Sequence, residues 1–388
     1  MLTRRTFVQT AGIGAAAWVA ARGRENSLWS AFEPSLEAVA PGMICLSSNE
    51  NPGGPGKTVL AGITAAFGPT GARPGRYDSS GRELIDAIAK KNNVKPENVV
   101  LGCGSTQILR SCTHLFTAKD RALVGTIPTY EECAGYAEMM GHPVRPVPLD
   151  ANFKIDLAKF ADAAKGAGLV FYCNPNNPTA TYVGARATRE FLARVAKDSP
   201  ETYVLVDEAY YDYVTDPDHD THIPAALDNP RVIVARTFSK AYGMAGLRIG
   251  YAIGHAETIK KMADWDAGAG TSSLNVLAMR AGIVAIEQDA SFIAAERAGN
   301  KDVRDFTMKW FADRGMKPTD SQANFMFVNI GRPVKGFRDA CRAKGVLVGR
   351  DFPPFEKTHC RISYGTMDEM KKAVAVFGEA LEKKATAA

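Results

Sequence analysis

The feature that most constrains the fold is an alternation of short apolar runs with amphipathic stretches, which begins near residue 97. Several runs are apolar at successive positions, as strands covered on both faces must be. The strand candidates are residues 98–104, 121–127, 168–174, 202–210, 231–237 and 247–254, and amphipathic segments such as 106–116 and 187–198 separate them. This order predicts an α/β fold with a mainly parallel sheet, in which functional groups gather at the carboxyl ends of the strands.

From about residue 287 the pattern changes to that of a smaller α+β domain. The expected elements are a long charged helix over 289–315, strands within 323–330, 345–350 and 359–365, a helix at 334–344 and a final helix. We therefore divide the mature chain into an N-terminal arm, a large domain and a small C-terminal domain. Their predicted ranges are 22–55, 56–286 and 287–388.

The first 21 residues are typical of a twin-arginine export signal. Arg4 and Arg5 are followed by Phe7 and by an alanine-rich run from Ala11 to Ala21, which is shorter than the ~20 residues that span a bilayer. We expect cleavage after Ala21 and a periplasmic location, with the export machinery as a transient partner. A disordered basic N-terminus and a short membrane anchor are the alternatives.

Charge and cysteine usage exclude several classes of protein. The 388-residue chain has a formal net charge of +5 and no basic run after its first residues, so we expect no nucleic-acid partner. Seven scattered cysteines without a CxxC predict neither a disulfide framework nor a zinc site. Cys103, Cys173 and Cys360 lie in apolar runs and are expected to be buried. Residues 216–222 hold acids and histidines, but we expect a solvated loop there and no metal.

One lysine lies among small hydroxyl and glycine residues in the segment 236–251. A neighbouring arginine can lower the pKa of Lys240, and a lysine with a lowered pKa can form a Schiff base with a carbonyl compound. Thr237, Ser239 and Arg248 supply two hydroxyls and a bidentate cation, the donors that bind phosphate. Pyridoxal 5′-phosphate is a carbonyl compound that carries a phosphate, and we therefore expect it as the cofactor.

Other strand ends carry residues that suit this cofactor. Asp207 ends an apolar strand, where a carboxylate could keep the pyridine nitrogen protonated, and Tyr210 could donate to the phenolate oxygen. Asn177 lies in a proline-rich loop, Tyr130 could stack on the ring, and the main chain at 104–106 opens a helix that could bind phosphate. Each of these also has a purely structural alternative, such as a helix cap, a turn or a core aromatic residue.

Taken together and in this order, the motifs resemble those of the class I/II, fold-type I pyridoxal-phosphate aminotransferases, and the nearest branch is that of the histidinol-phosphate aminotransferases. The motifs are LSSNENPGGPG, GCGSTQ, PTY, NPNNPTA, DEAY, TFSKAYGMAGLRIGY, ANFMFV and CRISYGT. The resemblance covers roughly residues 43–385. It implies a seven-stranded sheet in the large domain and a homodimer with shared active sites.

The resemblance also implies roles for the matching residues. Lys240 would carry the cofactor, and Asp207 would pair with its pyridine nitrogen. The other cofactor-binding residues are Ser105, Thr106, Tyr130, Asn177, Tyr210, Thr237, Ser239, Arg248 and the partner subunit's Tyr77. The expected substrate-binding residues are Asn51, Arg350 and Arg361, with Arg361 on the substrate α-carboxylate.

The expected reaction is a ping-pong transamination to a 2-oxo acid, in which Lys240 moves the proton of the substrate α-carbon. The expected donor is an L-amino acid, an aromatic one included, or histidinol phosphate. The histidinol-phosphate branch carries a tyrosine upstream of NENP, and this chain has none there. A lyase or decarboxylase on the same scaffold is the alternative enzyme. A non-catalytic exported binding protein would be expected to lack Lys240 or Asp207.

Overall fold

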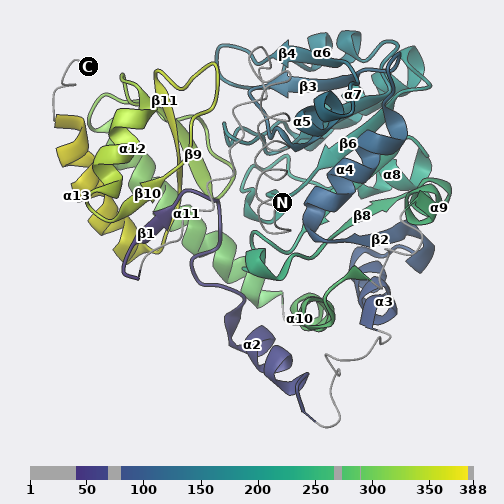
Figure 1. Cartoon of the computed structure of the whole chain (residues 1–388), viewed down its shortest axis with the longest axis horizontal. Coiled ribbons are helices and arrows are strands. Elements are labelled where there is room, and N and C mark those ends of the chain that lie inside the picture. The colour runs from purple at the N-terminus through teal and green to yellow at the C-terminus, as the bar shows by residue number, and fades with distance from the viewer. Residues whose placement is uncertain (1–40, 69–79, 266–272, 289, 383–388) are drawn as a thin grey trace, which may run out of the picture. The chain divides into compact units, whose positions relative to one another are not determined.

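The computed structural model describes residues 41–68, 80–265, 273–288 and 290–382. Within them, seven strands form one sheet in the order β2-β8-β7-β6-β5-β3-β4 (Figure 1). Of these strands, β8 alone runs in the direction opposite to the other six, which confirms the predicted mainly parallel sheet. The strand bounds are Val99–Gly102 (β2), Leu123–Ile127 (β3), Val144–Pro148 (β4), Leu169–Cys173 (β5), Tyr203–Asp207 (β6), Val232–Thr237 (β7) and Gly250–Gly254 (β8).

Helices cover the sheet, and this explains why its strands lack a polar alternation. Helix α4 (Gly104–Phe116) contacts β2, β7 and β8, while α6 (Leu157–Ala163) contacts β3 and β4. All five residues of β5 and of β8 are consequently buried. The other helices in this part of the chain are α2 (Gly56–Ala65), α3 (Ser80–Asn92), α5 (Glu132–Met139), α7 (Ala185–Asp198), α8 (Ile223–Asp228), α9 (Ala256–Trp265) and α10 (Val276–Glu287), with short 3₁₀ turns η1 (Pro96–Asn98), η2 (Tyr211–Tyr213) and η3 (Ala245–Leu247).

The C-terminal part of the chain builds a second hydrophobic core. Strand β9 (Phe325–Asn329) pairs antiparallel with β11 (His359–Ser363), and β10 (Val346–Val348) pairs in parallel with β1 (Ile44–Leu46). The helices here are α11 (Ser291–Ala312), α12 (Val334–Arg342) and α13 (Met367–Glu382), and they bury Phe311, Phe337 and Phe377. Residues 44–46, which we had assigned to an arm, thus contribute a strand to this core. The domain boundaries remain predictions.

Two features differ from the sequence analysis. Strand β4 was not predicted, because Pro146 and Pro148 interrupt its pattern, but it lies at the edge of the sheet, where a strand tolerates missing N–H donors. Cys103 was expected to be buried and is exposed. The reason is that β2 ends at Gly102, which leaves Cys103 in the turn that opens α4. Cys173 and Cys360 are buried, as expected.

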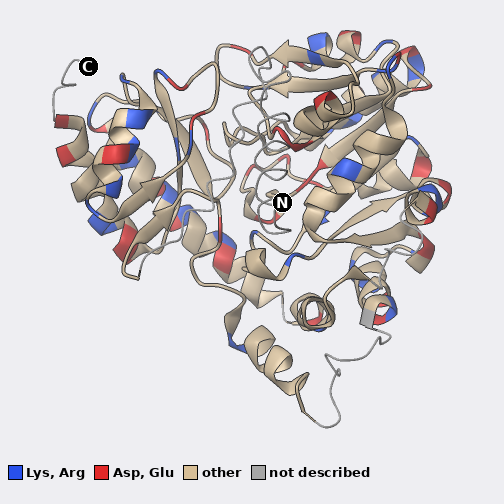
Figure 2. Ribbon diagram, in the orientation of Figure 1, with Lys and Arg blue, Asp and Glu red and all other residues tan. Residues whose placement is uncertain are grey.

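The described surface is mixed in charge. Figure 2 shows lysines and arginines interspersed with acidic residues over the described helices. None of the described helices is both long and apolar enough to cross a membrane. The proposed export signal, residues 1–21, lies outside the described residues.

Candidate functional site

The sheet topology brings most of the predicted residues to one edge. Strands β7, β6, β5 and β3 are neighbours that run in parallel, so the segments after their carboxyl ends are adjacent. The segments after β7, β5 and β3 hold Lys240, Asn177 and Tyr130, and Asp207 is the last residue of β6. Because β8 runs in the opposite direction, Arg248, which precedes it, lies at the same edge. The topology therefore brings these predicted residues to one edge of the sheet, while their functional roles remain predictions.

Asp207 is a buried carboxylate that lacks a cationic partner among the described residues. Its side-chain contacts are the main-chain N–H of Ala209, which donates to Oδ1 at 3.1 Å, and Cys173 Sγ, at 3.9 Å from Oδ2. Burial raises the pKa of Asp207 to about 7, although the Ala209 N–H and Lys240 both oppose the rise. A carboxylate in this state would gain from a cationic donor, such as a protonated pyridine nitrogen.

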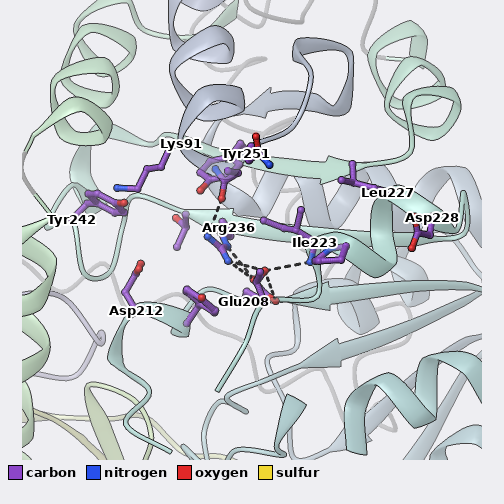
Figure 3. A pocket seen from close by; sticks show the side chains of 15 residues that line it. Lys91, Glu208, Asp212, Ile223, Leu227, Asp228, Arg236, Tyr242 and Tyr251 are labelled. Atoms are coloured by element: carbon purple, nitrogen blue, oxygen red, sulfur yellow. Dashed lines mark hydrogen bonds and ion pairs between the residues drawn. The ribbon is translucent and has the colours of Figure 1, made fainter. Parts of the chain in front are cut away.

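The neighbouring acid, Glu208, has a different role. It accepts a hydrogen bond from Arg236 Nη2 at 2.8 Å and pairs with His222 Nδ1 at 3.0 Å. Figure 3 shows Glu208 and Arg236 in contact in a cavity of about 560 Å³, which Lys91 also lines. Lys240, Asn177 and Arg361 are not among the residues that line it. Glu208 is therefore satisfied by the protein itself, whereas the adjacent Asp207 is not.

Lys240 is partly buried at this edge of the sheet, and its ammonium has no carboxylate partner among the described residues. Its Nζ donates to the main-chain oxygen of Ser48 at 3.1 Å and lies 5.6 Å from the centre of the Tyr210 ring. Burial, followed by the nearby charges of Arg361 and Arg248, lowers the pKa of Lys240 to about 8. The ε-amine is thus available as a nucleophile and a base near neutral pH.

The predicted phosphate-binding residues surround the start of α4. Arg248 Nη1 donates to Ser239 Oγ at 3.2 Å, and Thr237 Oγ1 accepts from the main-chain N–H of Ser239 at 3.1 Å. Two glycines allow Arg248 and the start of β8 to lie close to the start of α4. A Cβ on Gly104 would lie 2.3 Å from Arg248 Nη2, and a Cβ on Gly250 would lie 2.4 Å from the nitrogen of Ser105.

No side chain caps the amino end of α4. Its first N–H groups, at Ser105 and Thr106, have no acceptor within the helix, since the first four donors of any helix lack one. Together with the Arg248 guanidinium and the hydroxyls of Thr237 and Ser239, these N–H groups form a site that suits a phosphate. The residues therefore fit the phosphate of the predicted cofactor.

Asn177 and Tyr210 are held in place by residues far away in the sequence. Asn177 Oδ1 accepts from Arg361 Nη1 at 2.8 Å, which leaves the Asn177 amide nitrogen as a donor for a ligand. The Tyr210 hydroxyl accepts from Asn49 Nδ2 at 3.1 Å, and Asn49 Oδ1 in turn accepts from Ser363 Oγ at 2.7 Å. Because its oxygen acts as the acceptor from Asn49, the Tyr210 hydroxyl can direct its own proton to a cofactor oxygen. Asn49 was missed in the sequence analysis.

Arg361 is buried, with an exposed fraction of 7%, and has no carboxylate partner among the described residues. Besides Asn177, its guanidinium donates to the main-chain oxygen of Ser47, while Nε is buried without a hydrogen-bond partner. Burial lowers the pKa of Arg361 to about 10. A buried cation without an anion is costly, so this guanidinium is a strong candidate for binding a ligand carboxylate.

The other predicted residues divide into three cases. Asn51 uses its amide within the chain, since Nδ2 donates to Ala241 O at 3.0 Å and Oδ1 accepts from Gly53 N at 2.7 Å. Arg350 pairs with Glu131, a residue that the sequence analysis did not single out. Tyr77 lies outside the described residues.

Comparisons with known proteins agree with this geometry. Residues 41–377 match the model of the family "Aminotransferase class I and II". A histidinol-phosphate aminotransferase of Moorella thermoacetica is 34% identical over 345 residues, which cover 87% of this chain and 86% of that protein. One of Symbiobacterium thermophilum is 33% identical over 341 residues, 87% of this chain and 91% of that protein. The crystal structure of histidinol-phosphate aminotransferase from Sinorhizobium meliloti in complex with pyridoxal-5′-phosphate has a TM-score of 0.79 at 25% identity, covering 87% of this chain and 90% of that one.

We expect Asp207→Asn to change how the stability of the cofactor-free protein depends on pH. Folding raises the pKa of Asp207 from 3.8 to about 7, so the folded chain binds this proton more tightly than the unfolded chain. The contribution of Asp207 to the stability of the wild type should therefore fall as the pH rises from about 4 to about 7. Relative to the wild type, the variant should gain up to about 4 kcal/mol of unfolding free energy over that interval, measured by urea denaturation.

The matched control for this experiment is Asp120→Asn, which removes a carboxyl group from an exposed turn. Its unfolding free energy should follow the wild-type pH profile. An Asp207→Asn profile that runs parallel to the wild-type profile would contradict the description of Asp207 as a carboxylate that folding leaves without a cation.

Proposed function

The chain belongs to the class I and II aminotransferases, and on this premise we propose that it moves the amino group of an L-amino acid to a 2-oxo acid, with Arg361 binding the carboxylate that both substrates carry. The protein is a pyridoxal-phosphate-dependent aminotransferase. The observation that supports the choice of substrate is the buried Arg361 guanidinium, whose Nε has no partner.

The residues at the strand ends would hold the cofactor. When bound, pyridoxal phosphate supplies an electron sink that stabilises negative charge at the substrate α-carbon. Asp207 would keep a proton on the pyridine nitrogen, Asn177 and Tyr210 would donate to the phenolic oxygen, and Tyr130 would stack on the ring. The phosphate would be bound by Ser105, Thr106, Thr237, Ser239 and Arg248.

Lys240 would carry the cofactor and would move the proton. With a pKa of about 8, its Nζ can accept the proton of the substrate α-carbon near neutral pH and give it up again. Arg361 would orient the substrate by its carboxylate, and the hydrogen bond between Arg361 and Asn177 would fix that orientation relative to the cofactor. A 2-oxo acid would then use the same groups in the reverse half-reaction.

A second candidate for the amino donor is histidinol phosphate. The relatives described above carry its name, and they match most of the chain. In this compound a phosphate ester stands in place of the α-carboxylate. The two candidates therefore differ in the anion that Arg361 would bind.

Lys240→Ala should abolish transamination, with kcat reduced by about 10⁴-fold or more, because the variant lacks both the attachment point and the base. The measurement is turnover with a panel of L-amino acids, histidinol phosphate included. Lys91→Ala is the matched control, since burial also lowers the pKa of Lys91 but its side chain lines the cavity of Figure 3, which Lys240 does not line. Undiminished turnover by the Lys240 variant would rule out the proposed role.

We further propose that the protein is a homodimer in which the partner subunit's Tyr77 reaches the cofactor phosphate. The support is the match between the segment around this tyrosine and the corresponding aminotransferase motif. Light scattering of the cofactor-loaded protein should give the mass of two chains. A fully active species with the mass of one chain would contradict the shared site.

We also propose export through the twin-arginine route to the periplasm, with the cofactor loaded before transport. The support is the Arg4-Arg5 pair followed by Phe7 and an alanine-rich run. Replacement of both arginines by lysine should retain the protein in the cytoplasm on cell fractionation. A wild-type protein found only in the cytoplasm would refute this proposal.

A further inference from the structure

Glu131 follows Tyr130, the predicted stacking residue, and forms an ion pair with Arg350. Its Oε2 accepts a hydrogen bond from Arg350 Nη2 at 2.5 Å, and the two side chains are 12% and 22% exposed. Glu131 occupies the N-cap position of α5, yet its side chain caps no N–H group of that helix. The carboxylate is therefore directed to Arg350 and not to the helix it precedes.

This ion pair adjoins the proposed carboxylate-binding arginine. The guanidinium carbons of Arg350 and Arg361 lie over the same aromatic ring, that of Phe352, at 4.2 and 4.8 Å from its centre. Arg350 lowers and Glu131 raises the pKa of Arg361, as expected of a positive and a negative charge nearby. An anion bound at Arg361 would thus experience both charges.

The two candidate anions, a substrate α-carboxylate and a phosphate ester, differ in the number of positive charges that would match them. A carboxylate carries one negative charge and is matched by one guanidinium in a bidentate contact. A phosphate monoester carries a charge of about −1.5 to −2 at pH 7, and a second cation would strengthen its binding. Glu131 offsets the charge of the neighbouring cation, Arg350, and would itself repel a dianion at close range.

We propose, on the basis of the transamination proposed above, that Glu131 is a specificity-determining residue that makes the Arg361 site select a substrate α-carboxylate over a phosphate ester. Glu131 acts through Arg350 and need not touch the substrate. The physiological amino donor is accordingly an amino acid with a free carboxylate.

The test measures binding of two unreactive anions to the cofactor-loaded protein by calorimetry, at a pH above the second ionisation of the phosphonate. The probes are 3-phenylpropanoate and 2-phenylethylphosphonate, which differ only in the anionic group. The wild type should bind the carboxylate more tightly. Glu131→Gln should tighten phosphonate binding by about 10-fold or more, because a repelling charge is removed, while carboxylate binding should change by less than about 3-fold.

Two control variants separate this role from a general effect of charge or folding. Glu132→Gln removes the same charge one position away, where Glu132 pairs with Arg110, and it should keep the wild-type preference. Glu131→Asp keeps the negative charge and should also favour the carboxylate. The proposal is overturned if the wild type prefers the phosphonate, or if Glu131→Gln changes binding of both probes equally.

Binding of the two probes does not depend on turnover, so failure of the proposed role of Glu131 can be distinguished from failure of the proposed function. If no amino acid converts the cofactor to its aminated form while the carboxylate preference is observed, the reaction assignment fails and the selectivity of the anion site stands. If amino acids are converted but the preference is absent or unaffected by Glu131, the role of Glu131 fails alone.

Discussion

The hydrogen bond from Arg361 Nη1 to Asn177 Oδ1, 2.8 Å long, is the contact on which the rest of the site depends. It joins β11, from the C-terminal core, to the loop after β5, from the central sheet. It also settles the orientation of the Asn177 amide, so that the nitrogen is left for a ligand. Because Ser47 O accepts from the same guanidinium, the arginine is held from two sides while its charge stays unmatched by any described carboxylate.

The site as a whole combines charged groups that the protein positions but does not neutralise. Asp207, Lys240 and Arg361 all have pKa values displaced by burial, each toward the neutral form. Such a cluster is costly in the free protein and gains from ligands of the opposite charge. By contrast, the adjacent charges of Glu208 and Arg236 are paired with each other, which shows that the chain neutralises its own buried charges elsewhere.

The sequence analysis predicted the parallel sheet and its strand ends because these depend on local patterns. The apolar runs indicated strands β5, β6 and β7. Asp207 and Lys240 were predicted as site residues because they lie where β6 and β7 end. What it missed depends on contacts between distant segments. Asn49 meets Tyr210 across 161 positions, and Glu131 meets Arg350 across 219, so no local pattern reports either pair. Strand β4 was missed for a different reason, since its two prolines are tolerated only at the edge of the sheet.

The central claim is that this edge of the sheet positions one lysine to carry pyridoxal phosphate. Borohydride reduction of the cofactor-loaded protein, followed by peptide mass spectrometry, tests it most directly, because reduction makes the lysine linkage permanent. The structure predicts a stoichiometric adduct on the peptide that contains Lys240. An adduct on another lysine, or one spread over several surface lysines with Lys240 unmodified, would contradict the account.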